Sequence, residues 1–155
     1  MSVNGTIGQE RGKAVDNASG VWSMWLQPIL LVGIGSAIGG NLRYWLGRWV
    51  EAQQWPGGLP WGTIWVNLTG SLLLGFLAVW LLERLGPQWR GWYLFLGTGL
   101  CGGYTTFSTF EWETWQLIRQ GNWLLAVMNL VVSVLGGLLA LVGGVMLALW
   151  LLPRR

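Results

Sequence analysis

The sequence contains no histidine, and Cys101 is its one cysteine. Without histidine the chain lacks the usual general base and the usual ligand of transition metals. A single cysteine forms no intrachain disulfide and no cysteine-based metal site. The long apolar segments also hold no pair of carboxylates. We therefore expect that the protein is not an enzyme.

Charge is also scarce. Charged residues make up 10% of the chain and hydrophobic residues 53%, against roughly 25% and 45–50% in soluble domains. So few charges cannot cover the surface of a soluble core. The 14 tryptophans and 25 glycines suit membrane interfaces and close helix contacts in lipid. The formal net charge of +3 is too small to indicate nucleic-acid binding. The composition predicts an all-α integral membrane protein.

Polar turns divide the chain into a tail of residues 1–24 and a membrane domain of residues 25–153. The tail is rich in Gly, Ser, Asn and charged residues, which predicts disorder, with a short surface or regulatory helix as the alternative. The run 61–82 carries no charge over 22 residues, enough to cross a hydrocarbon core of ~30 Å. Four transmembrane helices are predicted, at about 25–49, 61–82, 91–118 and 123–152. The bias of Lys and Arg favours cytoplasmic termini.

Glycines are concentrated in two of these segments. Gly35 and Gly39, four residues apart in the first segment, predict close approach of a neighbouring backbone. In the third segment, Gly99, Gly102 and Gly103 each weaken a helix by about 1 kcal/mol relative to alanine. We expect this helix to be broken near its middle, at 102–105, where freed carbonyls could hold a hard cation such as Na⁺. The alternative is that these glycines only allow tight helix packing.

Donor-rich side chains follow these glycines. Phe107 and Phe110 are three residues apart, hence on one helix face, and phenyl rings have a positive edge. Asn67 in the second segment adds amide donors. The neighbouring hydroxyls are Thr105, Thr106, Ser108 and Thr109. The apolar segments contain these donors but no Asp or Glu. This combination favours an anion pathway over a cation or proton pathway.

Two further features each allow two interpretations. Arg43, near the end of the first segment, either extends to the lipid headgroups or faces a water-filled vestibule. Asn129, Ser133 and Gly137 form one stripe on the fourth segment. This stripe is either a helix–helix contact or a polar track along a pathway.

Three blocks of the sequence resemble the signature blocks of the Fluc/CrcB fluoride channels, and they occur in the family's order. The blocks are GSAIGGNLRY at 35–44, GTIWVNLTGS at 62–71 and GGYTTFSTF at 102–110. The similarity covers about residues 29–152. It implies a multi-pass channel of the bacterial plasma (inner) membrane that exports F⁻ passively and relieves fluoride toxicity.

The resemblance also implies an assembly. Family members are antiparallel, dual-topology homodimers with two pores and a central structural Na⁺. The Lys and Arg bias leaves open whether this chain inserts in both orientations or pairs with an oppositely oriented paralogue. The expected partners are therefore F⁻, the lipid bilayer and a second subunit, with no nucleic acid.

Site residues follow from the resemblance by position. Phe107 and Phe110 correspond to the aromatic box whose ring edges meet F⁻, and Asn67 to the pore amide. The further pathway positions are Ser108 and Thr109 beside the broken helix, Ser133 in the polar track and Arg43 in the vestibule. The positions whose backbone carbonyls would hold Na⁺ are Gly102 and Thr105.

Two other classes of protein fit the size and glycine content. A four-helix, dual-topology multidrug exporter would use a carboxylate in its first helix to exchange protons for cations. No acid lies between Asp16 and Glu51. A structural membrane subunit would not need Asn67 and the hydroxyl–phenylalanine cluster at separate positions in the membrane.

Overall fold

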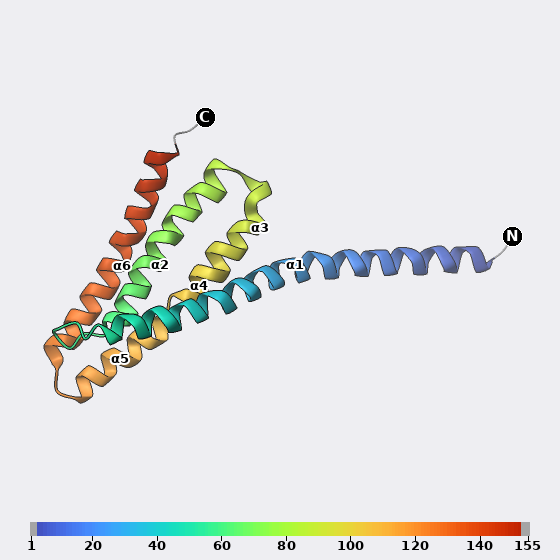
Figure 1. The fold of residues 1–155 in the computed structure, drawn as a ribbon. Helices are drawn as coiled ribbons and strands as arrows, with labels where there is room; N and C mark the ends of the chain where they lie inside the picture. Colours follow the sequence, from blue (N-terminus) through green and yellow to red (C-terminus); the bar gives the residue numbers. More distant parts are fainter. Residues whose placement is uncertain (1–2, 153–155) are drawn as a thin grey trace.

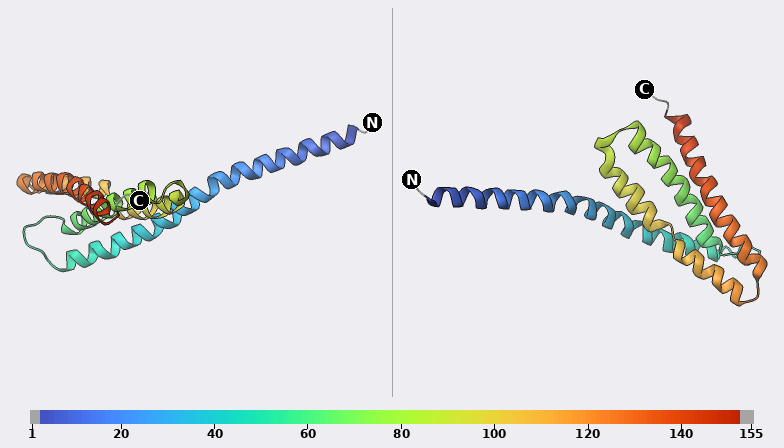
Figure 2. Two further views of the ribbon diagram at one scale, coloured as in Figure 1. Left: turned by 90° about the horizontal axis from the view of Figure 1, so that it is seen from above. Right: turned by 180° about the vertical axis from the view of Figure 1, so that it is seen from behind.

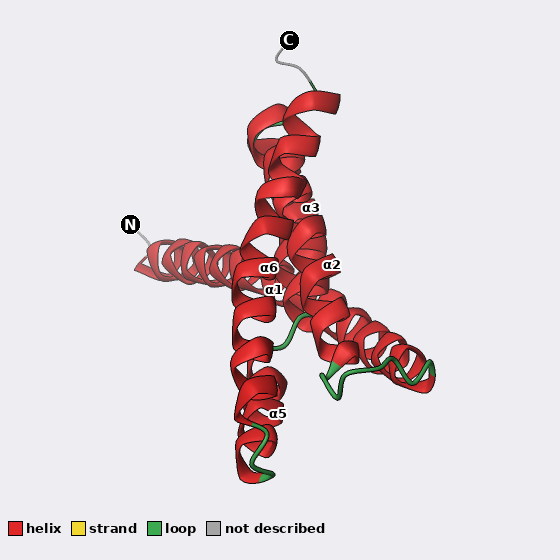
Figure 3. Cartoon of the chain, turned by 90° about the vertical axis from the view of Figure 1, so that its left-hand side faces the viewer, coloured by secondary structure: helices red, strands yellow, loops and turns green. Residues whose placement is uncertain are grey.

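A computed structural model describes the backbone of residues 3–152 and the side chains of residues 26–152. Every regular element in this part of the chain is a helix, as predicted (Figure 3). The α-helices are α1 (Val3–Ala52), α2 (Trp61–Ala78), α3 (Arg90–Tyr93), α4 (Gly102–Tyr104), α5 (Phe107–Arg119) and α6 (Trp123–Leu151). Two π-helical stretches, η1 (Val79–Arg84) and η3 (Leu94–Cys101), and the 3₁₀ turn η2 (Pro87–Trp89) complete the order.

Three helices are long and apolar enough to cross a membrane. They are Leu26–Ala52, Trp61–Arg84 and Trp123–Leu151, which match the first, second and fourth predicted segments. The remaining segment is built from shorter pieces, α3, η3, α4 and α5. The loop 53–60 and the turn before α6 lie at one end of the bundle. The turn after η1 and the end of α6 lie at the other (Figure 1).

The first helix is longer than expected. α1 runs from Val3 to Ala52 with Pro28 inside it, so most of the predicted disordered tail is helical in the structure. Figure 1 shows this part of α1 extending well beyond the other helices. Adding residues to an existing helix costs far less than nucleating one. A polar composition therefore does not by itself end a helix that continues into a long apolar segment.

Glycines set the helix packing. α2 and α6 lie side by side (Figure 1). A Cβ at Gly75 would overlap the carbonyl oxygen of Leu141, and one at Gly144 would overlap that of Leu72. Each helix therefore approaches the other through a residue without a side chain, which is the usual way for membrane helices to make close contact.

α1 packs against the third segment and α2 (Figure 2). A Cβ at Gly35 or Gly39 would overlap the backbone of η3, so the close approach predicted from these two glycines is confirmed. Gly103 lies equally close to the backbone of Ser36. The Ser36 hydroxyl donates a hydrogen bond to the Gly99 carbonyl (3.3 Å).

The third segment leaves the helical conformation between α4 and α5. Thr105 (φ −77°, ψ 158°) and Thr106 (φ −148°, ψ 120°) are extended, and α5 begins at Phe107. The sequence placed the irregular backbone at 102–105. In the structure Gly102 and Gly103 belong to α4, and Gly103 serves the contact with α1. The two threonines are the extended residues because side chains of other helices bind their backbone, as described next.

Candidate functional site

Asn67 of α2 binds the extended backbone of Thr106. Its Nδ2 donates to the Thr106 carbonyl (3.0 Å), and its Oδ1 accepts from the Thr106 N–H (2.7 Å). The amide thus satisfies both polar groups of a residue that has left the helix, which matters because unpaired backbone groups are costly in lipid. An amide nitrogen carries two hydrogens, so Asn67 keeps one further donor.

Thr106 also caps α5. Its Oγ1 accepts from the Thr109 N–H (3.2 Å) and donates to Thr109 Oγ1 (2.9 Å). Because Thr109 Oγ1 accepts this bond, its own hydrogen remains available to another acceptor. The first N–H groups of a helix lack intrahelical partners and carry partial positive charge. The start of α5 is therefore a cluster of donors.

The first cavity has a volume of about 430 Å³ and contains four of the predicted pathway residues, Asn67, Phe107, Phe110 and Ser133. We call it the aromatic cavity. The Phe107 and Phe110 rings lie 5.5 Å apart, centroid to centroid, with their planes at 52°. Phe110 is 3% exposed, whereas Phe107 is 68% exposed. The pair therefore reaches from the bundle interior to an open face of the chain.

A second cavity of about 290 Å³ contains Arg43 and Thr109. We call it the arginine cavity. Thr106 lines both cavities, so they lie on either side of the same extended residue. Arg43 is half-buried, and its Nη1 donates to the Thr105 carbonyl (3.2 Å). Arg43 therefore lines this cavity. Ser108 is exposed and lines neither cavity.

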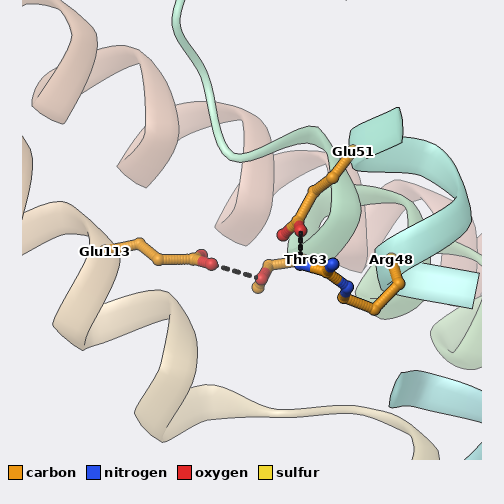
Figure 4. A network of polar contacts seen from close by, with 4 residues as sticks. All are labelled: Arg48, Glu51, Thr63 and Glu113. Atoms are coloured by element: carbon orange, nitrogen blue, oxygen red, sulfur yellow. Dashed lines mark hydrogen bonds and ion pairs between the residues drawn. The ribbon is translucent and has the colours of Figure 1, made fainter. Parts of the chain in front are cut away.

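Sequence reasoning missed Glu113, which lines the arginine cavity. The Thr63 hydroxyl donates to Glu113 Oε1 (2.8 Å), as Figure 4 shows. Glu113 Oε2 is buried with no hydrogen-bond partner among the described residues. A carboxylate therefore lies beside one of the two cavities, at a position that the sequence analysis did not select. Helical spacing could have found it, because Glu113 follows Thr109 by four residues, one turn along the same face of α5.

The outer rim of the arginine cavity carries an ion pair. Arg48 Nη1 and Glu51 Oε2 lie 3.9 Å apart with both side chains more than half exposed, and Figure 4 shows them beside Thr63. Exposed pairs of this kind add little stability. The pair partly offsets the charge of Arg48, and Arg43 forms no such ion pair within the described residues.

The residues of the polar stripe on α6, Asn129, Ser133 and Gly137, have different surroundings. Asn129 is fully buried and donates from Nδ2 to Thr114 Oγ1 on α5 (2.8 Å). Ser133 and Gly137 line the aromatic cavity. Asn129 thus makes a helix contact, while the other two residues face the cavity.

The predicted Na⁺ ligands are two backbone carbonyls. The Thr106 N–H, which would reach back to Gly102 in a continuous helix, bonds to Asn67 instead, so the Gly102 carbonyl loses its helical donor. Gly102 is exposed, and the Thr105 carbonyl accepts from Arg43. A hard cation takes such oxygens but needs more than two of them. These two carbonyls of one chain are therefore too few to hold such an ion by themselves.

Long apolar helices packed through glycine define this protein as a multi-pass α-helical membrane protein. The chain belongs to the CrcB family: the model described as CrcB-like protein, Camphor Resistance (CrcB), matches residues 30–145. The resemblance seen in the three sequence blocks is thereby confirmed.

Proteins of similar sequence support this family assignment. The chain is 46% identical over 122 residues to a fluoride-specific ion channel FluC of Chloroflexus aurantiacus, covering 79% of this chain and 95% of the relative. It is 43% identical to the FluC of Rhizobium meliloti, over 77% of this chain and 94% of the relative. It is also 43% identical to FluC 1 of Listeria innocua, over 76% and 94%. These relatives are named as ion channels, not as enzymes.

Proposed function

We propose that this protein is a fluoride channel that lets F⁻ leave the bacterial cytoplasm passively through the plasma membrane. The observation that carries the proposal is the aromatic cavity, where the Phe107–Phe110 pair meets Asn67 and Ser133. Membership of a family whose relatives are named fluoride-specific channels supports the choice of ion.

The cavity chemistry suits a small anion. F⁻ is strongly hydrated, so a pathway must replace its water with donors while staying too narrow for larger anions. Phenyl ring edges supply positive potential without a buried cation. The remaining Asn67 hydrogen and the Ser133 hydroxyl supply hydrogen bonds. The apolar rings also exclude water, which strengthens each of these interactions.

The two cavities suggest a route. Arg43 in the arginine cavity raises the local concentration of anions at the mouth. The ion then meets the Thr109 hydroxyl and the start of α5, passes Thr106, and enters the aromatic cavity. Ser108, exposed on the first turn of α5, contributes its hydroxyl at the face where a second subunit packs. Ser133 continues the route along α6.

The proposal includes an antiparallel dimer. The exposed Phe107 ring lies at an open face of a single chain, and a second subunit there would enclose the pathway. We assign this subunit to a second copy of the chain, with an oppositely oriented paralogue as the alternative. The Gly102 carbonyl, which loses its helical donor because the Thr106 N–H bonds to Asn67, is left for a partner or an ion.

We also propose that a Na⁺ ion binds between the two copies. The free, exposed Gly102 carbonyl and the Thr105 carbonyl from each copy would together supply four oxygen ligands, a coordination that no single copy provides. Because the Arg43 guanidinium already binds the Thr105 carbonyl, that carbonyl would be shared between the ion and the arginine. The ion would hold the two copies together and compensate the freed carbonyls.

Expression in bacteria that lack a fluoride exporter tests the proposal in cells. We expect the chain to restore growth in millimolar fluoride and to lower the fluoride retained by the cells. The same cells should also be tested for resistance to organic cations. A multidrug exporter needs a carboxylate in the membrane, and Glu113 is a candidate for it. Resistance to organic cations without fluoride resistance would overturn the channel in favour of the exporter.

A further inference from the structure

α5 is attached to the bundle by a narrow buried stripe. Its buried side chains are Phe110, Thr114 and Leu117, at spacings of four and three residues, hence on one face. The opposite face is exposed, including Trp112 and Trp115. Lipid gives helices no hydrophobic drive to associate, so polar contacts on such a stripe contribute much of the attachment.

The polar contact on this stripe comes from Asn129. Its side chain is 0% exposed, and that of Thr114 is 6% exposed. Asn129 Nδ2 donates to Thr114 Oγ1 at 2.8 Å, which joins α6 to α5 in the buried interior. A buried amide without partners is costly, so this pairing holds both helices in one position relative to each other.

The direction of each hydrogen bond can be deduced. The Phe110 carbonyl only accepts, so the Thr114 hydroxyl must donate to it (2.8 Å). Thr114 Oγ1 then accepts from Asn129, which requires the amide nitrogen to face Thr114. The Asn129 oxygen therefore faces Ser133, whose hydroxyl donates to it at 3.3 Å. The Phe110 carbonyl, which can only accept, thus determines which atom donates in each of the three hydrogen bonds.

This chain of bonds ends at the aromatic cavity on both sides. Phe110 on α5 and Ser133 on α6 both line that cavity. Asn129 itself does not line it and has no exposed surface. It therefore touches both cavity walls through its neighbours and does not contact an ion in the cavity.

We propose that Asn129, together with Thr114, is a positioning residue that sets the Phe110 wall of the pathway against the Ser133 wall. This inference rests on the proposed fluoride channel for its effect on transport. The longest bond in the chain, from Ser133, is the one that an anion can replace, since a hydrogen bond to an anion is stronger than one to a neutral oxygen. Asn129 thus holds the Ser133 hydroxyl ready at the wall.

Two matched substitutions at Thr114 test the role in transport. Thr114→Ser keeps the hydroxyl, whereas Thr114→Val keeps the shape and removes it. In liposomes we expect Thr114→Ser to carry F⁻ within about twofold of the parent and Thr114→Val to carry roughly three- to eighteenfold less, the fold-change that corresponds to the measured strength of hydrogen bonds between membrane helices. Asn129→Leu should resemble Thr114→Val. Equal flux in all four proteins would overturn the proposal.

A double variant separates positioning from general damage. Thr114→Val combined with Asn129→Leu removes both members of the buried pair, so neither is left without the other, and we expect it to fold even where a single variant does not. Both changes remove the Asn129–Thr114 bond, and Asn129→Leu also removes the acceptor of Ser133, so we expect the double variant to lose no more flux than Asn129→Leu alone. A folded double variant with parental flux, or with the product of two separate losses, would overturn the proposal.

Backbone hydrogen exchange tests the anchoring independently of transport. We expect residues 107–119 to exchange faster in Asn129→Leu than in the parent, because α5 has lost its buried polar contact with α6. Unchanged exchange would overturn the anchoring. A parent that carries no F⁻ would overturn the proposed function, while the exchange result would still decide whether Asn129 positions α5.

Discussion

The side chain of Asn67 and the backbone of Thr106 are joined by two hydrogen bonds, at 3.0 and 2.7 Å. The amide occupies the place of a neighbouring strand beside an extended residue. A polar side chain on one membrane helix thereby stabilises a non-helical residue of another. The same amide lines the aromatic cavity with its remaining donor. Support of the backbone and contact with an ion therefore meet in one residue.

Replacing Asn67 should lower fluoride flux, whereas replacing an exposed asparagine should not. Asn67→Leu removes both bonds to Thr106 and the free donor, so we expect fluoride flux to fall at least about tenfold, the effect of losing roughly 1.4 kcal/mol. Asn41→Leu is the matched control, because Asn41 is exposed and bonds only within its own helix, to the Ala37 carbonyl. Similar losses at both positions, measured by efflux from liposomes, would contradict a special role for Asn67.

The aromatic pair should be required for transport more than for folding. Phe107→Ile and Phe110→Ile replace a ring edge by an aliphatic chain that carries no positive potential. We expect both to lower fluoride flux while the protein elutes from detergent gel filtration as the parent does. Trp115→Ile, on the exposed face of α5, is the control. Flux that stays at the parental level in both phenylalanine variants would argue against the aromatic cavity as the pathway.

Helix packing can be tested at two adjacent glycines. A Cβ at Gly144 would overlap the Leu72 backbone, whereas one at Gly143 meets nothing within 4 Å. Gly144→Ala should therefore destabilise the protein by about 1–3 kcal/mol, as overpacking does, and Gly143→Ala should not. Thermal unfolding in detergent measures the difference. Equal midpoints for the two variants would contradict the close contact of α2 and α6.

Arg43 should act through its charge. Arg43→Gln removes the positive charge from the arginine cavity, so we expect fluoride flux to fall at low ionic strength and the deficit to shrink as salt screens the field. Arg48→Gln is the control, because Arg48 is 69% exposed and pairs with Glu51. A deficit in Arg43→Gln that does not depend on salt would assign the residue to its bond with Thr105 instead.

Much of this site could be predicted from local sequence. The apolar segments followed from the scarcity of charge, and Gly35 and Gly39 were found by their spacing. Phe107, Phe110 and Asn67 stood out as polar or aromatic groups at membrane depth. Each of these signals lies within one segment, where composition and helical period suffice to detect it.

The remainder depends on contacts between segments. Thr105 and Thr106 are extended because Asn67 and Arg43 bind their backbone, and no local propensity reports that. Glu113 follows the uncharged run of the third segment, and its hydrogen bond with Thr63 depends on the packing of another helix. The partner of Asn129 lies on another helix. The length of α1 was missed because composition measures solubility rather than helix propagation.

The most direct measurement is anion efflux from liposomes that contain the purified protein, with F⁻ and Cl⁻ followed in parallel by ion-selective electrodes. A narrow pathway of ring edges and hydrogen-bond donors predicts rapid efflux of F⁻ down its gradient, with no proton gradient required, and Cl⁻ efflux no faster than from protein-free liposomes. Efflux of both ions at similar rates, or of neither, would contradict a fluoride-selective channel.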